Sequence, residues 1–288
     1  MKDSKLLLGN FDTLWGKYSK RLINCQQTGS EEAVHKLRIS CRRLLAIMAL
    51  LQALDPKSSF GKLRKQIKTQ LDSFDELRDT QVMLIVITDS LNALADLADY
   101  HRYLKLNEQR LLAKIQDLFK NTQYADQQAL FKKVRNKLSI SPTLLTQPIL
   151  AIIDNHYQIA LTRHHVISAD TPGSLHHLRI ALKKLRYMIS ASKPFLPELP
   201  INHANHMQSY LTRLGEIQNS TVLLDSINRF FGHQPPDKVH ARFESRHQSL
   251  LNDYFVHSHE ITGFWRANPY QDFPWQQDKG ISARPGRF

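Results

Sequence analysis

Two copies of one short motif stand out in this sequence. The first copy reads His35-Lys36-Leu37-Arg38-Ile39-Ser40-Cys41-Arg42-Arg43, and the second reads His176-His177-Leu178-Arg179-Ile180-Ala181-Leu182-Lys183-Lys184. On a helix, residues spaced at i, i+3 and i+7 fall within about 60° of one another. The residues with this spacing are His35, Arg38 and Arg42 in the first copy and His176, Arg179 and Lys183 in the second. Each copy therefore predicts a row of cations along one face of a helix.

Apolar residues follow a neighbouring face of both predicted helices. They are Val34, Leu37, Cys41, Leu44 and Met48 in the first copy and Leu175, Leu178, Leu182, Leu185 and Ile189 in the second. This spacing is typical of a helix that packs against a core. Arg186 extends the second basic row. Because a buried stripe would hold each row of cations rigidly, the pattern favours a polyanionic ligand.

The overall charge agrees with a polyanionic partner. The chain has 288 residues, a formal net charge of +13 at pH 7 and 14 histidines. Such a balance is typical of proteins that bind nucleic acid, anionic lipid or another polyanion. Cys25 and Cys41 have neither a metal-binding nor a disulfide-framework spacing. With no leader pattern and no apolar run long enough to span a bilayer, we expect a cytoplasmic protein without a membrane partner.

Helical periodicity extends to about residue 260, which predicts an all-α fold. Ser30 and Ser174 are predicted N-caps of the two basic helices, and Asp79 is the predicted N-cap of a later helix. The basic helices should end near Asp55-Pro56 and Lys193-Pro194. Further helices are predicted over 6–25, 60–76, 82–98, 100–119, 131–138, 144–165, 203–218, 220–231 and 238–257.

A second pair of similar segments indicates an internal duplication. Glu76-Leu77-Arg78-Asp79-Thr80-Gln81-Val82-Met83-Leu84 aligns with Glu216-Ile217-Gln218-Asn219-Ser220-Thr221-Val222-Leu223-Leu224. The separation of this pair equals that of the basic motifs to within one residue. We therefore predict two copies of a four-helix unit, over about 5–138 and 144–257. Residues 263–288 are predicted to be an irregular, weakly ordered tail.

These repeated segments resemble the CHAD domain, the conserved histidine α-helical domain. The resemblance rests on Val34-His35-Lys36-Leu37-Arg38, Leu77-Arg78-Asp79-Thr80-Gln81-Val82, Leu175-His176-His177-Leu178-Arg179 and Lys184-Leu185-Arg186-Tyr187, and it covers about 5–257. It implies two pseudo-symmetric four-helix bundles around a basic channel that binds inorganic polyphosphate. It also implies association with polyphosphate granules in the cytoplasm. One departure is Gln218-Asn219, which replaces the Arg78-Asp79 of the first copy.

The candidate ligand-binding residues are basic side chains on or near the repeated helices. They are His35, Arg38, Arg42, Arg43, Arg78, His176, Arg179, Lys183, Lys184 and Arg186, followed by the weaker candidates Arg64, Lys65 and Lys68, which have no basic counterparts in the second copy. Arginine offers paired donors to phosphate oxygens and lysine a mobile point charge. Each histidine is predicted in the first turn of its helix, where free N–H groups favour an anion. On this basis, reversing Arg38 and Arg179 to Glu should abolish binding without changing the melting temperature.

Three other functions fit the sequence less well: nucleic-acid or general polyanion binding, an enzymatic activity, and binding to a membrane surface, for which the apolar faces are already assigned to the core. A nucleic-acid or general polyanion binder is the runner-up, but single-strand binders place aromatic side chains among their cations, and here only Tyr187 is near. An enzyme is not expected, because the sequence contains no phosphate-loop glycine motif and no acidic pair positioned for magnesium. His164-His165 and His203 with His206 lack the further ligands of a metal site, so neither a metal nor a cofactor is expected. The sequence leaves the oligomeric state open.

Overall fold

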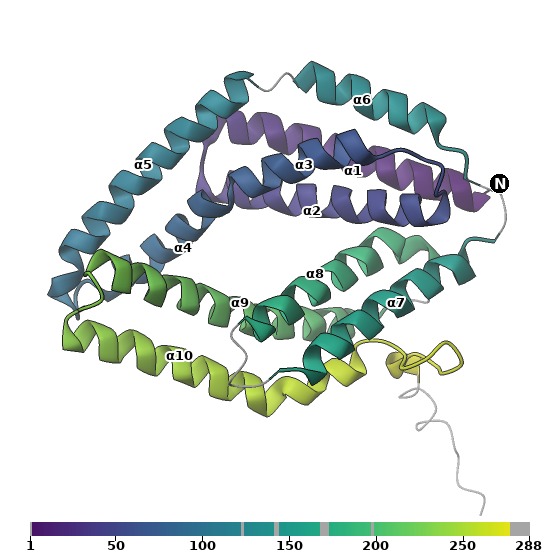
Figure 1. Ribbon diagram of the computed structural model, residues 1–288. Helices are drawn as coiled ribbons and strands as arrows, with labels where there is room; N and C mark the ends of the chain where they lie inside the picture. Colours follow the sequence, from purple (N-terminus) through teal and green to yellow (C-terminus); the bar gives the residue numbers. More distant parts are fainter. Residues whose placement is uncertain (1, 122–123, 141–143, 168–172, 197–198, 277–288) are drawn as a thin grey trace, which may run out of the picture. The chain divides into compact units, whose positions relative to one another are not determined.

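Every regular element among the described residues is a helix, which confirms the predicted all-α fold (Figure 1). The structure is a computed structural model that describes residues 2–121, 124–140, 144–167, 173–196 and 199–276. The α-helices are α1 (Lys2–Thr28), α2 (Glu31–Leu54), α3 (Gly61–Ser73), α4 (Asp75–Ser90), α5 (Ala98–Asn121), α6 (Tyr124–Lys137), α7 (Thr146–His165), α8 (Ser174–Ser192), α9 (Ile201–Phe230) and α10 (Asp237–His257). Short 3₁₀ helices are η1 (Ala95–Leu97), η2 (Lys193–Phe195) and η3 (Ser258–Gly263).

The chain divides into two compact units that differ from the predicted halves. The first unit contains the described residues up to 143 together with 219–247. The second contains 144–218 together with the described residues from 248 onward. Helices α9 and α10 thus each contribute one part to each unit. The duplicated halves over 5–138 and 144–257 stay a prediction from the sequence.

In the first unit, α1 and α2 form a helical hairpin around Gly29. The φ angle of Gly29 is +57°, a left-handed conformation that glycine adopts without the steric penalty of a side chain. Ser30 confirms its prediction as N-cap, because its side-chain oxygen accepts a hydrogen bond from the Ala33 N–H at 3.2 Å. Glu31 and Glu32 follow in the first turn, where the helix dipole favours negative charge. Helix α2 ends at Leu54, just before Asp55-Pro56, as expected.

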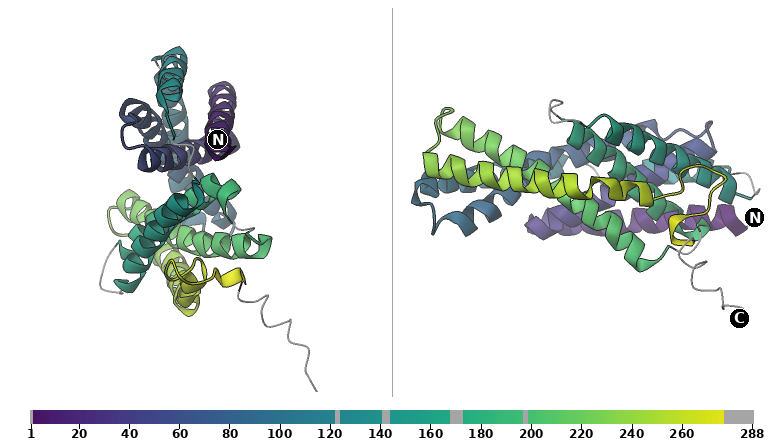
Figure 2. Two further views of the ribbon diagram at one scale, coloured as in Figure 1. Left: turned by 90° about the vertical axis from the view of Figure 1, so that its right-hand side faces the viewer. Right: turned by 90° about the horizontal axis from the view of Figure 1, so that it is seen from below.

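A second group of helices in this unit encloses its own apolar core. Met83 and Ile87 from α4 pack with Tyr100 and Leu104 from α5 and with Ile227 from α9. Val239 and Phe243 from α10 complete the cluster. Figure 2 shows α10 running back along the second half of α9, which is how both helices reach this core.

The helix boundaries predicted between residues 60 and 98 are wrong. Helix α3 ends at Ser73 and α4 begins at Asp75, so Asp79 lies inside α4 instead of capping it. Phe74 is buried at the junction and continues the apolar spacing, and Asp75 and Glu76 occupy the first turn of α4. Helix α4 ends at Ser90, and residues 91–97 form turns and η1 before α5.

In the second unit, α7 packs along α8 (Figure 1). The N-cap of α8 is Gly173, with φ +82°, and it makes no side-chain cap hydrogen bond. The prediction of Ser174 as the N-cap is therefore wrong. Ser174 is the first helical residue, and it is buried. Pro194 follows the end of α8 at Ser192, as expected.

Helix α9 runs without interruption over a segment predicted to contain two helices. The predictions over 203–218 and 220–231 are replaced by one helix, Ile201–Phe230. Residues 218–220 include no proline or glycine, so nothing between the two predicted helices forces a break in α9. Ser220 is buried within this helix, at 7% exposure.

The segment after α10 is irregular, as predicted, but its described part is firmly packed. Phe264 and Trp265 are 1% and 0% exposed, and Phe273 and Trp275 are also buried. The Trp265 indole N–H donates to Asp154 of α7 at 2.7 Å. The prediction of a weakly ordered tail is therefore wrong for residues 263–276, while 277–288 lie outside the described residues.

Candidate functional site

The four candidate ligand-binding residues of the first motif occupy different environments on α2. His35 is exposed, and Arg42 and Arg43 are partly buried. Arg38 is only 6% exposed. His35 is the fifth residue of α2, so the prediction that it lies in the first turn is wrong. These side chains therefore do not form one continuous solvent-facing row.

Arg38 joins α2 to the junction of α3 and α4. Its Nη1 donates to the backbone oxygen of Leu71 at 3.1 Å and pairs with the Asp75 carboxylate at 2.6 Å. Leu71 is near the end of α3, where carbonyl groups lack a helical partner. The guanidinium thus donates to a backbone carbonyl at the end of α3 and pairs with a carboxylate at the start of α4. The expected exposure of Arg38 is wrong, because its planar donors bind within the protein.

Arg78 and His35 are two further basic residues of this unit: Arg78 is partly buried and His35 is exposed. Arg78 on α4 makes an ion pair with Glu31 at the start of α2. The pKa of His35 is lowered by burial and by the positive charges of Arg78, Arg42 and Arg38, while Glu31 opposes the shift. The neighbours of His35 therefore create a net positive potential.

Arg21 on α1 is a basic neighbour that the sequence reasoning missed. Its Nη1 donates to the Ser40 hydroxyl at 2.7 Å and to the Lys36 backbone oxygen at 3.2 Å. Burial and the positive charge of Arg43 lower the pKa of Arg21. The Arg43 Nε is buried with no hydrogen-bond partner among the described residues. The only sequence signal for Arg21 is its position three residues after Tyr18, beside the buried stripe of α1.

The weaker candidates on α3 are exposed. These residues are Arg64, Lys65 and Lys68. Lys68 pairs with Asp72 at 2.7 Å, one turn along the same helix. Among the contacts made by the described residues, none joins these three side chains to the basic residues of α2 or α4.

The second motif places an exposed histidine at the start of α8. His176 is the third residue of this helix, in the first turn as predicted. Its Nδ1 lies 2.6 Å from the Gln218 Oε1 of α9. Because a carboxamide oxygen only accepts, Nδ1 carries the proton in this contact. Gln218, the counterpart of Arg78, thus orients the histidine of the second motif.

The remaining basic residues of α8 extend along the helix from His176. Arg179, Lys183 and Arg186 are partly buried, and Lys184 is exposed. The Arg179 guanidinium lies against Gly215 of α9. Burial and the charge of Lys184 lower the pKa of His156 on α7. Cations at residues 179, 183 and 186 climb α8 by about 1.5 Å per residue, as the sequence predicts.

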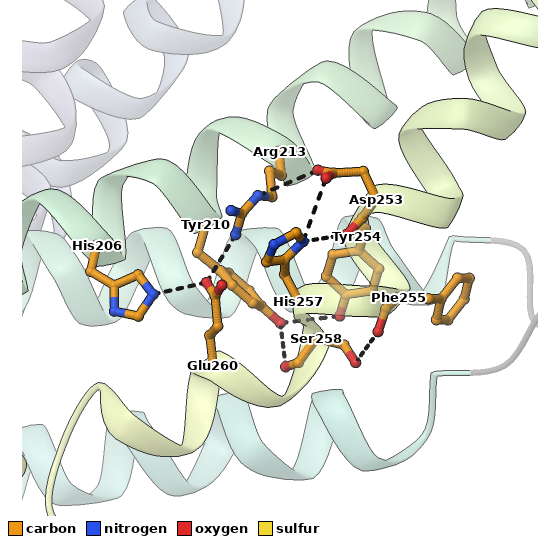
Figure 3. Close-up of polar contacts among 9 residues, drawn as sticks. All are labelled: His206, Tyr210, Arg213, Asp253, Tyr254, Phe255, His257, Ser258 and Glu260. Atoms are coloured by element: carbon orange, nitrogen blue, oxygen red, sulfur yellow. Dashed lines mark hydrogen bonds and ion pairs between the residues drawn. The ribbon is translucent and has the colours of Figure 1, made fainter.

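A separate polar network joins the end of α10 to α9 in the second unit (Figure 3). Arg213 pairs with Glu260 at 2.9 Å and with Asp253 at 3.4 Å. His206 lies 2.9 Å from the same Glu260 carboxylate, and His257 lies 3.4 Å from Asp253. These contacts hold η3 and the end of α10 against α9. The network therefore explains His206 as a structural residue.

The described residues also bear on metal binding and on membrane crossing. Among the described residues, no group of three or more His, Cys, Asp or Glu side chains is arranged to hold a metal ion. His203 is instead hydrogen-bonded to the Phe264 backbone oxygen at 3.0 Å. None of the helices that the structure describes combines the length and apolar character needed to cross a membrane.

Comparisons with known proteins give a matching family model, a solved structure with a similar fold and a partial sequence relative. Residues 17–228 match the CHAD domain. The crystal structure of the CHAD domain from the plant Ricinus communis superposes with a TM-score of 0.68 at 16% identity, covering 91% of this chain and 89% of that one. A stretch of 100 residues is 29% identical to Transport and Golgi organization protein 6 of Drosophila melanogaster. That stretch is 35% of this chain and 11% of the relative's length.

Proposed function

The chain belongs to the CHAD domain family, and from this premise we propose that it binds inorganic polyphosphate without catalysing its turnover. The observation that carries the proposal is the basic surface of α8, where His176, Arg179 and Lys183 lie on one helix. Arg186 and the exposed Lys184 add two further positive charges. A phosphate chain carries regularly spaced charge without bases, so a rigid series of cations suits it.

The first unit contributes a smaller basic surface. His35, Arg42, Arg43 and Arg78 remain its candidate ligands, whereas Arg38 is excluded from the proposal because its guanidinium binds Leu71 and Asp75. Partial burial and the positive charges of Arg78, Arg42 and Arg38 lower the pKa of His35, while Glu31 opposes the shift. A bound phosphate would then favour the protonated ring and gain a charge-assisted hydrogen bond.

The runner-up is a general polyanion or nucleic-acid binder. Single-strand binders use aromatic side chains as stacking platforms between their cations. On α8 the nearest aromatic residue is Tyr187, which is partly buried. The composition of this surface therefore favours a polyanion without bases. Association with polyphosphate granules in the cytoplasm is part of the same proposal.

A salt-titrated competition experiment tests the choice of ligand. Labelled long-chain polyphosphate is bound to the full chain and challenged with single-stranded DNA, RNA and heparin at matched charge. We expect polyphosphate to survive an excess of each competitor at roughly 0.15 M salt, where distant surface charges are screened. Equal competition by all four polyanions would replace the proposal with general polyanion binding.

A further inference from the structure

Gly215 occupies a buried position inside α9, directly beneath the guanidinium of Arg179. A Cβ atom built at Gly215 would lie 3.0 Å from the Arg179 Nη2, 3.5 Å from its Nε and 3.7 Å from its Cζ. All three of the nearest atoms thus belong to this one side chain. The absence of a side chain at residue 215 creates the space in which the guanidinium lies.

The backbone of α9 gives no other reason for a glycine at this position. Glycine is less favourable than alanine in the interior of a helix. Gly215 lies in the middle of Ile201–Phe230 and is not among the residues with positive φ. The conformation is therefore open to any L-amino acid, and the close approach of Arg179 is what a larger residue would disturb.

The first unit shows what a side chain does at the equivalent position. The alignment of 76–84 with 216–224, extended by one residue, pairs Asp75 with Gly215. Asp75 binds Arg38 at 2.6 Å, and the Arg38 side chain is 7% exposed. Gly215 offers no carboxylate, and Arg179 interacts with other residues and is partly exposed.

Gly215 and Gln218 of α9 contact two basic residues that lie one turn apart on α8. Gln218, nearly one turn after Gly215, holds the His176 ring by a 2.6 Å contact. Gly215 receives the guanidinium of Arg179, one turn after His176. Two residues of α9 thus contact His176 and Arg179 of α8.

We infer that Gly215 is a positioning residue for polyphosphate binding, acting through Arg179. This inference rests on the proposed function. A methyl group at residue 215 would displace the guanidinium by a few tenths of an ångström or more, because 3.0 Å is closer than ordinary carbon–nitrogen contact. Bidentate contacts to phosphate depend on such geometry, so the displacement weakens binding.

The test compares Gly215→Ala with Gly16→Ala in the full chain. Gly16 is an exposed glycine inside α1, and a Cβ there meets no atom within 4 Å. Both changes favour the helix, so neither should lower the melting temperature. We expect Gly215→Ala to weaken polyphosphate binding about three- to tenfold, with the salt dependence unchanged because no charge is removed. Gly16→Ala should leave the affinity unchanged.

A double-mutant cycle with Arg179→Gln shows whether the effect passes through Arg179. In the Arg179→Gln background, Gly215→Ala should have no further effect on affinity. Wild-type affinity of Gly215→Ala, an additive effect in the cycle, or a lower melting temperature would each overturn the role of Gly215. Failure of the unaltered chain to bind polyphosphate would instead overturn the proposed function itself.

Discussion

Arg38 and Arg179 occupy the same place in the repeated motif but have different surroundings. Arg38 is 6% exposed and binds the Leu71 backbone oxygen and the Asp75 carboxylate. Arg179 lies against Gly215 and is partly exposed. Position in the motif therefore does not determine the role of the side chain. The residues that contact the guanidinium in the folded protein determine it.

Replacing Arg38 by alanine should destabilise the fold. The change leaves a helix-end carbonyl and a carboxylate without their donor, which we expect to lower the free energy of unfolding by about 2 kcal/mol. The value is below that of a fully buried pair, because Asp75 is 55% exposed. Urea denaturation monitored by circular dichroism measures the change.

The matched control for this prediction is Lys184→Ala, which removes an exposed cation from α8. Its effect should stay within about 0.5 kcal/mol, as for most surface substitutions. Equal stability of the Arg38→Ala variant and the unaltered chain would show that the contacts to Leu71 and Asp75 contribute nothing. For the same structural reason Arg38→Glu should lower the melting temperature, in contrast to the expectation from the sequence.

His35 should make polyphosphate binding depend on pH. Burial and nearby arginines lower the pKa of His35 in the free protein, and a bound polyanion would raise it. The complex then binds more protons than the free protein, so affinity should increase as the pH falls from 8 toward 6. The measurement is the dissociation constant as a function of pH at fixed salt.

The control for this prediction is His35→Gln, which keeps a hydrogen-bond donor but removes the titrating ring. The variant should show a weaker pH dependence over the same range, with the remainder arising from other histidines. An identical pH profile for the variant and the unaltered chain would rule out a role for His35 in the coupling.

Among the elements, the segment from η3 to residue 276 is anchored by an aspartate and a tyrosine of α7. Asp154 is 8% exposed and accepts hydrogen bonds from the Trp265 indole and from two nitrogens of Arg266. Tyr157, one turn along α7, donates to the backbone oxygens of Ile261 and Thr262. This part of the chain therefore belongs to the core of the second unit.

Asp154→Ala should release this segment from α7. Removing the carboxylate leaves the Arg266 guanidinium buried without its partner, a change that we expect to cost about 3 kcal/mol. Limited proteolysis should then cut after residue 257 faster than in the unaltered chain. Asp272→Ala is the control, since that aspartate is exposed. Equal cleavage rates in both variants would mean that Asp154 does not anchor the segment.

The helices were predictable where local chemistry specifies their ends. Ser30 caps α2 and Pro56 follows its last turn, and both signals are visible in the sequence. The junction at Phe74 was not predictable, because a buried phenylalanine continues the helical pattern and no breaker marks the end of α3. Likewise, the resemblance of 216–224 to 76–84 suggested a break in α9 that the structure does not contain.

At the scale of the whole molecule, the sequence predicted which helices carry basic side chains but not how those side chains are used. Arg38 binds the Leu71 backbone oxygen and the Asp75 carboxylate, both of which are distant from it in the sequence. Arg21 reaches Ser40 only because α1 and α2 form a hairpin. Such contacts follow from tertiary packing, and the periodicity of one helix contains no information about them.

Stability should fall when the protein is acidified. Burial is the first cause of the lowered pKa of His156, His164 and His203, all in the second unit. The unfolded chain then binds more protons than the folded chain as the pH drops below the ordinary histidine value of about 6.5. The stabilisation present above this value is lost as the pH falls through it.

Thermal unfolding at pH 7.5 and 5.5 measures this effect. We expect a lower melting temperature at pH 5.5, and His156→Gln should reduce the difference because one of the three groups no longer titrates. His177→Gln is the control, since His177 is exposed on α8. A melting temperature that is unchanged or higher at pH 5.5 would contradict the prediction.

The most direct test of the polyphosphate proposal is the affinity of two charge-matched double variants. Lys183→Gln with Lys184→Gln alters α8, and Lys132→Gln with Lys133→Gln removes the same charge from the exposed face of α6. At roughly 0.15 M salt, the α8 variant should bind long-chain polyphosphate at least about tenfold more weakly than the unaltered chain, and the α6 variant within about threefold of it. Equal losses in both variants, or no binding by the unaltered chain, would contradict the proposal.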